Sequence, residues 1–108
     1  KISNDFPDVA LTKIEPNFRT AVVLLTHDPK LDDPALYIAL RSEAFYIGAL
    51  GSRKTHMQRK SRLKNASFSE KQIDRIYAPI GLNIGAASPE EIAISILSEI
   101  ISILRVIN

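Results

Sequence analysis

A continuous apolar run at residues 21–25, Ala-Val-Val-Leu-Leu, constrains the fold more than any other feature of the sequence. Because the run is rich in β-branched residues and has no polar alternation, it is typical of a strand buried on both faces, as in a parallel sheet. It ends at the polar residues and proline of 26–29. The run therefore predicts a sheet that is covered by helices on both sides.

Elements of alternating type follow this strand. Residues 33–42 are typical of a helix, with Asp33 as its N-cap and Pro34 in the first turn, where a missing N–H costs little. Residues 44–48 predict a second buried strand, and a basic helix is expected over about 53–65.

The next segment carries weaker signals. Ser69 and Gln72 form a capping box, which predicts a short helix that reaches about Tyr77. Residues 80–85 contain glycines at both ends and predict a short strand or, alternatively, a second ligand-facing loop at the same edge of the sheet. Residues 9–11 are a further, weaker candidate for a strand.

The clearest local signal is a second capping box, Ser-Pro-Glu-Glu at residues 88–91. Ser88 caps a helix, Pro89 takes its first position, and Glu91 closes the box. This helix should run from 89 to about 106, with its polar residues confined to one narrow stripe. So wide an apolar face needs cover on more than one side, and we expect it to pack both on the sheet and on a second copy in a homodimer.

Strands and helices that alternate at this spacing predict an α/β fold with right-handed crossovers. We expect a three-layer domain with a mostly parallel sheet of about four strands and a long C-terminal helix. A length of 108 residues fits a single domain, residues 1–108.

The composition excludes several kinds of site. The chain has no cysteine, which excludes disulfides, thiolate metal sites and thiol catalysis. It has two histidines, so a multi-histidine zinc site is not expected and we predict no metal site. No apolar stretch approaches the roughly 18–20 residues of a membrane span. Because the N-terminus also lacks a signal-peptide pattern, we expect a cytoplasmic protein that does not contact a membrane.

Two segments follow the ends of the first two strands, at the edge where open α/β sheets bind ligands. Thr26, His27 and Asp28 follow the first strand, and His27 could serve as an acid, base or donor unless the segment is only a turn. Residues 48–53 follow the second strand, and their glycines and the helix N-terminus are suited to binding a phosphate. The alternative is a tight turn in which Ser52 only caps the helix. The predicted ligand-binding residues are Thr26, His27, Asp28, Gly48, Gly51, Ser52 and Arg53, and none is predicted to be catalytic.

Charge is unevenly distributed along the chain. The net charge is +2, yet residues 53–64 hold six basic residues and no acid, so the rest of the chain is net negative. We expect a solvated helix face that includes His56, because only Met57 and Leu63 could dock on a core. An interaction module for nucleic acid or an acidic protein is the alternative. No aromatic residue lies among the basic ones, which counts against a nucleic-acid partner.

Together these segments resemble the Rossmann-like C-terminal domain of the xanthine dehydrogenase accessory factor family (XdhC/CoxI). Four motifs carry the resemblance in the family's order and spacing, and residues 5–8 resemble the stretch just upstream. The motifs are Thr-Ala-Val-Val-Leu-Leu-Thr-His-Asp at 20–28, Tyr-Ile-Gly-Ala-Leu-Gly-Ser-Arg at 46–53, Pro-Ile-Gly-Leu-Asn-Ile-Gly at 79–85 and Ser-Pro-Glu-Glu-Ile-Ala at 88–93. The resemblance covers nearly the whole chain and implies a partial Rossmann-like domain.

The resemblance also implies a function. Proteins of this family help to mature molybdenum hydroxylases: they bind the molybdenum cofactor, a pterin that carries a phosphate, protect it during sulfuration and deliver it to the apo-enzyme. It implies a cofactor carrier or chaperone rather than an enzyme, with an apo-enzyme of the xanthine dehydrogenase type as its partner.

The chain departs from the family at its start. It has no strand with the G-x-G turn that opens the family's domain, and the family's cysteine-bearing N-terminal domain is absent. The missing strand would leave a sheet edge exposed, which favours association with a second copy or with a missing N-terminal half. The alternative function is a degenerate NAD(P)-binding domain or small oxidoreductase, with His27 and Asp28 as an acid–base pair and residues 48–53 on the dinucleotide. The absence of the G-x-G turn counts against it.

Overall fold

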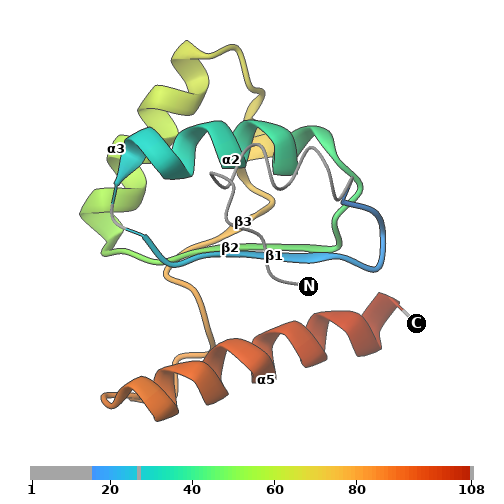
Figure 1. Cartoon of the computed structure of the whole chain (residues 1–108), viewed down its shortest axis with the longest axis vertical. Coiled ribbons are helices and arrows are strands. Elements are labelled where there is room, and N and C mark those ends of the chain that lie inside the picture. The colour runs from blue at the N-terminus through green and yellow to red at the C-terminus, as the bar shows by residue number, and fades with distance from the viewer. Residues whose placement is uncertain (1–15, 27, 108) are drawn as a thin grey trace.

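The structure is a computed structural model and describes residues 16–26 and 28–107 (Figure 1). The elements within these residues are, in chain order, β1 (Ala21–Leu24), α2 (Pro29–Arg41), β2 (Tyr46–Ala49), α3 (Arg53–Asn65), α4 (Glu70–Ile73), β3 (Ile76–Tyr77) and α5 (Pro89–Ile107).

The strands of the described residues form one parallel sheet in the order β1-β2-β3. β1 and β2 pair along their whole length, from Ala21 beside Tyr46 to Leu24 beside Ala49. β3 pairs with only two residues of β2. Because all the strands run in one direction, their carboxyl ends share one edge of the sheet.

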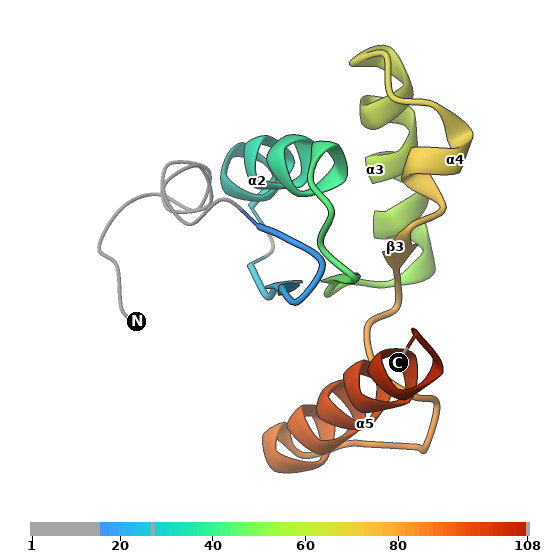
Figure 2. The same cartoon turned by 90° about the vertical axis from the view of Figure 1, so that its right-hand side faces the viewer.

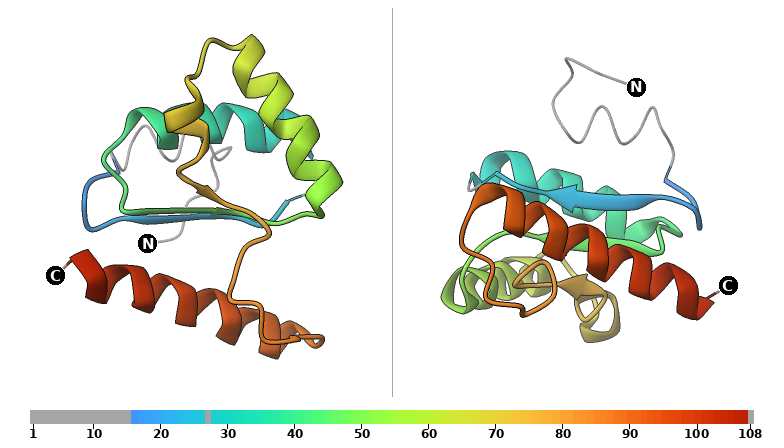
Figure 3. Two further views of the ribbon diagram at one scale, coloured as in Figure 1. Left: turned by 180° about the vertical axis from the view of Figure 1, so that it is seen from behind. Right: turned by 90° about the horizontal axis from the view of Figure 1, so that it is seen from below.

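Helices cover both faces of the sheet. α2, α3 and α4 lie on one face and α5 lies on the other (Figures 1 and 2). The view from below shows that α5 runs across the sheet (Figure 3). The predicted three-layer α/β fold with a parallel sheet and a long C-terminal helix is therefore confirmed.

Each face of the sheet has its own apolar cluster. On the α2 side, fully buried side chains include Leu36, Leu40 and Ile47. On the α5 side, Tyr46 and Ile96 are buried together. Tyr46 and Ile47 are neighbours on β2 and belong to opposite clusters, because successive side chains of a strand point to opposite faces. Burial of each large apolar side chain contributes about 1.5–3 kcal/mol.

The prediction that Asp33 caps the first helix was wrong. α2 begins at Pro29, and Asp28 is its N-cap, with the Asp28 carboxylate accepting a 3.0 Å hydrogen bond from Lys30 N–H. Asp28 and Pro29 already provide the N-cap and first position of a helix, so no later start is needed. Asp33 lies within α2 and is 8% exposed.

The predictions between Ile73 and Gly85 also need correction. The short helix ends at Ile73 rather than near Tyr77, and β3 lies where its last turn was expected. Of the two alternatives for 80–85, the structure has the loop and not the strand, because Gly81 (φ +94°) and Gly85 have positive φ angles that a strand does not accommodate. The sheet of the described residues therefore has three strands, and the candidate strand at 9–11 lies outside them.

The two predicted capping boxes are confirmed. Ser69 with Gln72 forms the capping box of α4, and Ser52, whose capping role was left as an alternative, caps α3. Glu91 accepts from Ser88 N–H at 3.0 Å, and Ser88 Oγ accepts from Glu91 N–H at 3.2 Å. No helix in the part of the chain that the structure describes is long and apolar enough to cross a membrane.

Candidate functional site

The two predicted ligand segments follow strands that end side by side. The last residues of β1 and β2 pair with each other, and Leu50 N–H donates a 2.9 Å hydrogen bond to Leu24 O just beyond the pairing. The segment after β1 and the turn after β2 therefore leave the sheet at the same edge. His27 lies outside the described residues.

The side chains after β1 are engaged in local contacts. Thr26 Oγ1 donates a 2.7 Å hydrogen bond to Asp32 Oδ1 and accepts one from Asp28 N–H at 3.2 Å. Asp28 caps α2 and is exposed. These contacts shape the segment and connect it to α2.

The predicted residues of the turn after β2 have different surroundings. Gly48 is buried in β2, where a Cβ would lie 2.5 Å from the side chain of Ile80. Gly51 has a φ of +137°, which favours glycine. Ser52 Oγ accepts from Thr55 N–H at 3.1 Å, and Arg53 is exposed at the first position of α3.

A cavity of about 420 Å³ lies next to this turn. It is lined by the loop at 79–86, by Leu50 and Arg53 from the turn, and by Ile92 and Ser95 from α5. The volume lies within the range of about 300–1,000 Å³ that is usual for small-molecule sites. The cavity thus joins the turn after β2 to the loop that the sequence offered as a second ligand-facing segment.

Hydrogen bonds hold the 79–86 loop against α5. Glu99 Oε1 accepts from Gly81 N–H at 3.0 Å and from the Tyr46 hydroxyl at 2.5 Å. Leu82 N–H donates to Ser95 O at 3.1 Å. Burial, and then the carboxylate of Glu99, raise the pKa of Tyr46 well above its usual value, so this hydroxyl remains a donor at any physiological pH.

The cavity wall is chemically simple. Leu82 and Ile84 are exposed apolar side chains, and Asn83 adds a polar amide. Among its lining residues, all within the described part of the chain, Arg53 is the only ionisable side chain. The site therefore offers an apolar surface, one cation and the N-terminus of α3, which suits binding of an anionic ligand more than acid–base chemistry.

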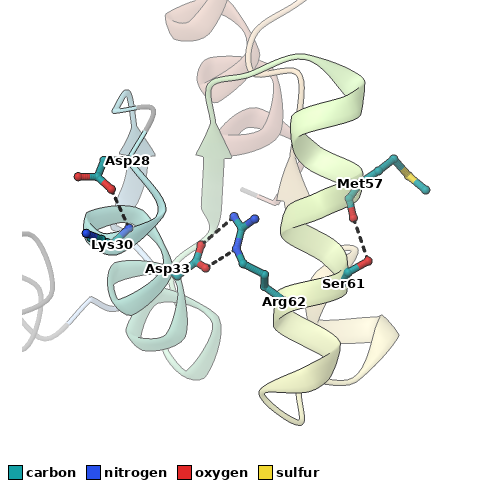
Figure 4. A network of polar contacts seen from close by, with 6 residues as sticks. All are labelled: Asp28, Lys30, Asp33, Met57, Ser61 and Arg62. Carbon is teal, nitrogen blue, oxygen red and sulfur yellow. Dashed lines mark hydrogen bonds and ion pairs between the residues drawn. The ribbon is translucent and has the colours of Figure 1, made fainter.

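Two of the six basic residues of α3 face inward, so the solvated face predicted for this helix is partly wrong. Arg62 forms an ion pair with Asp33 of α2, with Nε 2.6 Å from Oδ2, while Met57 points away from α2 (Figure 4). Arg59 is 3% exposed and donates a 3.0 Å hydrogen bond to Leu50 O.

His56 was predicted on the helix surface and is instead half-buried beside Arg59. Its Nδ1 lies 3.1 Å from Arg59 Nη1. Because a guanidinium can only donate, Nδ1 is the acceptor and the ring proton is on Nε2. Burial, and then the charge of Arg59, lower the pKa of His56 to about 4.

Sequence reasoning missed the contribution of α5 to the site. Ile92 and Ser95 line the cavity, and Glu99 holds its loop, yet all three sit in a helix that was interpreted only as core and interface. The glycines at 81 and 85 were the one available signal, because they indicated a turning backbone just before the helix that begins at 89. Such a loop lies next to the first turns of that helix.

Comparison with known proteins finds one matching family and several similar proteins. Residues 2–100 match the family described as the XdhC Rossmann domain. The molybdenum cofactor insertion chaperone PaoD of Escherichia coli (strain K12) is 37% identical over 98 residues, which cover 91% of this chain and 30% of that protein. A probable xanthine dehydrogenase subunit of Bacillus subtilis (strain 168) is 33% identical over 96 residues, 89% of this chain and 27% of that protein.

A solved structure agrees with these relatives. The crystal structure of a xanthine dehydrogenase from Bacillus halodurans matches with a TM-score of 0.73 and 37% identity, over 94% of this chain and 28% of that one. The chain therefore spans less than a third of the length of each of these proteins.

Proposed function

Because this chain belongs to the XdhC Rossmann domain family, we propose that it binds the molybdenum cofactor and takes part in maturing molybdenum hydroxylases. A relative that is named a molybdenum cofactor insertion chaperone supports this role, as does one whose name places it in a xanthine dehydrogenase. The proposal takes residues 1–108 as one Rossmann-like domain of a cytoplasmic accessory factor, which acts as a carrier rather than an enzyme.

The observation that carries the proposal is the cavity of about 420 Å³ with Arg53 as its only ionisable lining residue. A pterin that carries a phosphate has flat heteroaromatic rings, which pack on apolar side chains and hydrogen-bond to polar groups, and a phosphate that a cation can bind. Leu50 and the 79–86 loop offer the first, and Arg53 beside the N-terminus of α3 offers the second. When bound, the cofactor supplies the molybdenum chemistry, whereas these residues hold and shield it.

The experiment is a binding measurement on Arg53→Ala. The probe is molybdenum cofactor released anaerobically from a purified molybdenum hydroxylase, and affinity is measured by calorimetry. Hydrogen bonds to charged groups contribute about 1.5–3 kcal/mol, so the affinity should fall about 10- to 150-fold. Lys54→Ala is the matched control, since Lys54 is an exposed cation that does not line the cavity. Wild-type protein that binds NAD(P) but not the cofactor, or equal affinity for Arg53→Ala, would contradict the proposal.

The partners are part of the same proposal. Delivery of the cofactor requires contact with a molybdenum hydroxylase apo-enzyme, and the relatives named above support that class of partner. A homodimer is the second contact that we propose. Its support is an apolar stripe on the outward face of α5, where Ile94, Leu97 and Ile101 are each more than half exposed.

A further inference from the structure

Arg59 is a buried cation that contacts the turn after β2. Its guanidinium donates a 3.0 Å hydrogen bond to Leu50 O and a 3.1 Å hydrogen bond to His56 Nδ1. It also packs beside Gly51, where an added Cβ would lie 3.6 Å from Arg59 Nη2. Arg59 therefore links the start of the turn to the first turn of its own helix, α3.

Burying the charge of Arg59 costs free energy unless acidic groups and hydrogen bonds offset the loss of water, and here one of its nitrogens lacks a hydrogen bond to any described residue. Burial lowers the pKa of Arg59, whereas the charges of Asp32 and Asp33 oppose that effect. Arg59 Nε has no hydrogen-bond partner among the described residues. An apolar side chain would fill the same space without this desolvation cost, so the arginine is not explained by packing alone.

We propose that Arg59 is a positioning residue: by holding Leu50 O, it fixes the turn from which Arg53 reaches the cavity. The inference rests on the proposed function, because the cavity is its object. Leu50 and Arg53 both line the cavity, and one of the two residues between them is Gly51, whose φ of +137° favours glycine. A clamp on the Leu50 carbonyl limits the orientations of that interval and so lowers the entropy lost on binding.

The same buried charges reach the segment after β1. The Asp32 carboxylate accepts the hydrogen bond of Thr26, and its charge acts on Arg59. Asp32 thus holds Thr26 of the segment after β1 and interacts electrostatically with Arg59, which holds Leu50 of the turn after β2.

The chain contains a matched control at the other end of β2. Arg75 donates to Leu40 O at 2.8 Å and to Ala44 O at 2.9 Å, just before β2 begins. Arg75 thus makes the same kind of contact as Arg59, and it does not line the cavity.

Amide hydrogen exchange tests the clamp without any ligand. Leu50 N–H donates to Leu24 O at one end of β2, and Phe45 N–H donates to Thr20 O at the other. In Arg59→Met, which keeps most of the side-chain volume without a buried charge, exchange at Leu50 should accelerate at least tenfold relative to Phe45. In Arg75→Met, exchange at Phe45 should instead accelerate at least tenfold relative to Leu50. Equal acceleration at both amides in Arg59→Met would overturn the proposal.

Binding of anaerobically released molybdenum cofactor tests the consequence at the cavity. Arg59→Met and Arg59→Lys should each lower the affinity at least tenfold at a temperature where they are fully folded, while Arg75→Met stays within twofold of wild type. Wild-type affinity in a folded Arg59 variant would overturn the positioning role. Wild-type protein that fails to bind would instead overturn the proposed function, and the exchange result would still decide whether Arg59 holds the turn.

Discussion

The Tyr46 hydroxyl donates a 2.5 Å hydrogen bond to Glu99 Oε1, which joins the central strand to α5 across 53 residues of chain. The same carboxylate oxygen accepts from Gly81 N–H, so one side chain ties the sheet, the cavity loop and the C-terminal helix together. Tyr46 also stacks on Tyr77, with ring centroids 4.9 Å apart.

Tyr46→Phe removes only the hydroxyl of this contact. Because the bond is to a charged group inside a buried cluster, the free energy of unfolding should fall by about 1.5–3 kcal/mol. Urea denaturation measures the loss. Tyr77→Phe, which keeps the stacked ring, is the control and should change stability by much less. Equal stability of Tyr46→Phe and wild type would show that the contact contributes nothing.

Gly81→Ala and Gly85→Ala separate steric contact from backbone strain. Both glycines have a positive φ, for which an L-residue costs about 1–2 kcal/mol. A Cβ on Gly81 would also lie 2.5 Å from Ser95 Oγ and 3.3 Å from Ile96 N, whereas one on Gly85 meets no atom within 4 Å. Gly81→Ala should therefore be the more destabilising substitution, as measured by chemical denaturation. Similar losses for the two variants would mean that the loop can move away from α5 easily.

His56 makes stability depend on pH. Its pKa is about 4 in the folded protein and near 6.5 when unfolded, so the unfolded chain binds more protons between these values. The stabilisation is complete above pH 6.5 and should be lost as the pH falls from 6.5 towards 4. Urea denaturation across this range should show a smaller pH dependence for His56→Gln than for wild type.

A direct titration checks the same prediction. In a His27→Gln background, His56 is the only histidine of the chain, and its ring resonances can be followed by NMR. They should titrate near pH 4. A midpoint near 6.5 would contradict the half-buried, neutral ring beside Arg59.

The outward face of α5 predicts self-association. Leu97 and Ile101 are 58% and 53% exposed, and burial of each in an interface would contribute about 1.5–3 kcal/mol. Leu97→Lys combined with Ile101→Lys should convert a dimer to a folded monomer in analytical ultracentrifugation. Met57→Lys is the matched control, because Met57 is 62% exposed on α3, far along the chain from α5. A wild-type protein that sediments as a monomer at high micromolar concentration would refute the dimer.

Local signals in the sequence predicted the elements whose ends are set by neighbouring residues. The capping residues Ser69 and Ser88 begin the helices that they were expected to begin, because an N-cap acts on N–H groups two or three residues away. Ser52 also caps a helix, the role that the sequence left as an alternative to ligand binding. The apolar run at 21–25 predicted a strand of a parallel sheet from its β-branched composition, and β1 forms there. Its burial is less complete than predicted, because Ala21 and Val23 are only half-buried and Leu25 is exposed beyond the end of the strand.

Competition between neighbouring signals explains the wrong boundaries. Asp28-Pro29 and Asp33-Pro34 are equivalent caps in sequence, and the earlier pair begins α2 while Asp33 faces Arg62 on another helix. The capping box at Ser69 predicted a helix that would include Ile76 and Tyr77. These two residues instead form β3, because they hydrogen-bond to the free edge of β2. Neither choice can be read from nearby residues.

The sequence by itself determined the type of each main element, the parallel layered fold and the two segments that leave the sheet at its carboxyl edge. Only the tertiary structure decided that Arg53 meets the 79–86 loop in a cavity, that Glu99 holds that loop, and that Arg59 turns inward beneath Leu50. Capping, strand burial and helix periodicity depend on residues a few positions apart. The cavity and its supports depend on side chains that are separated along the chain and that packing alone brings together.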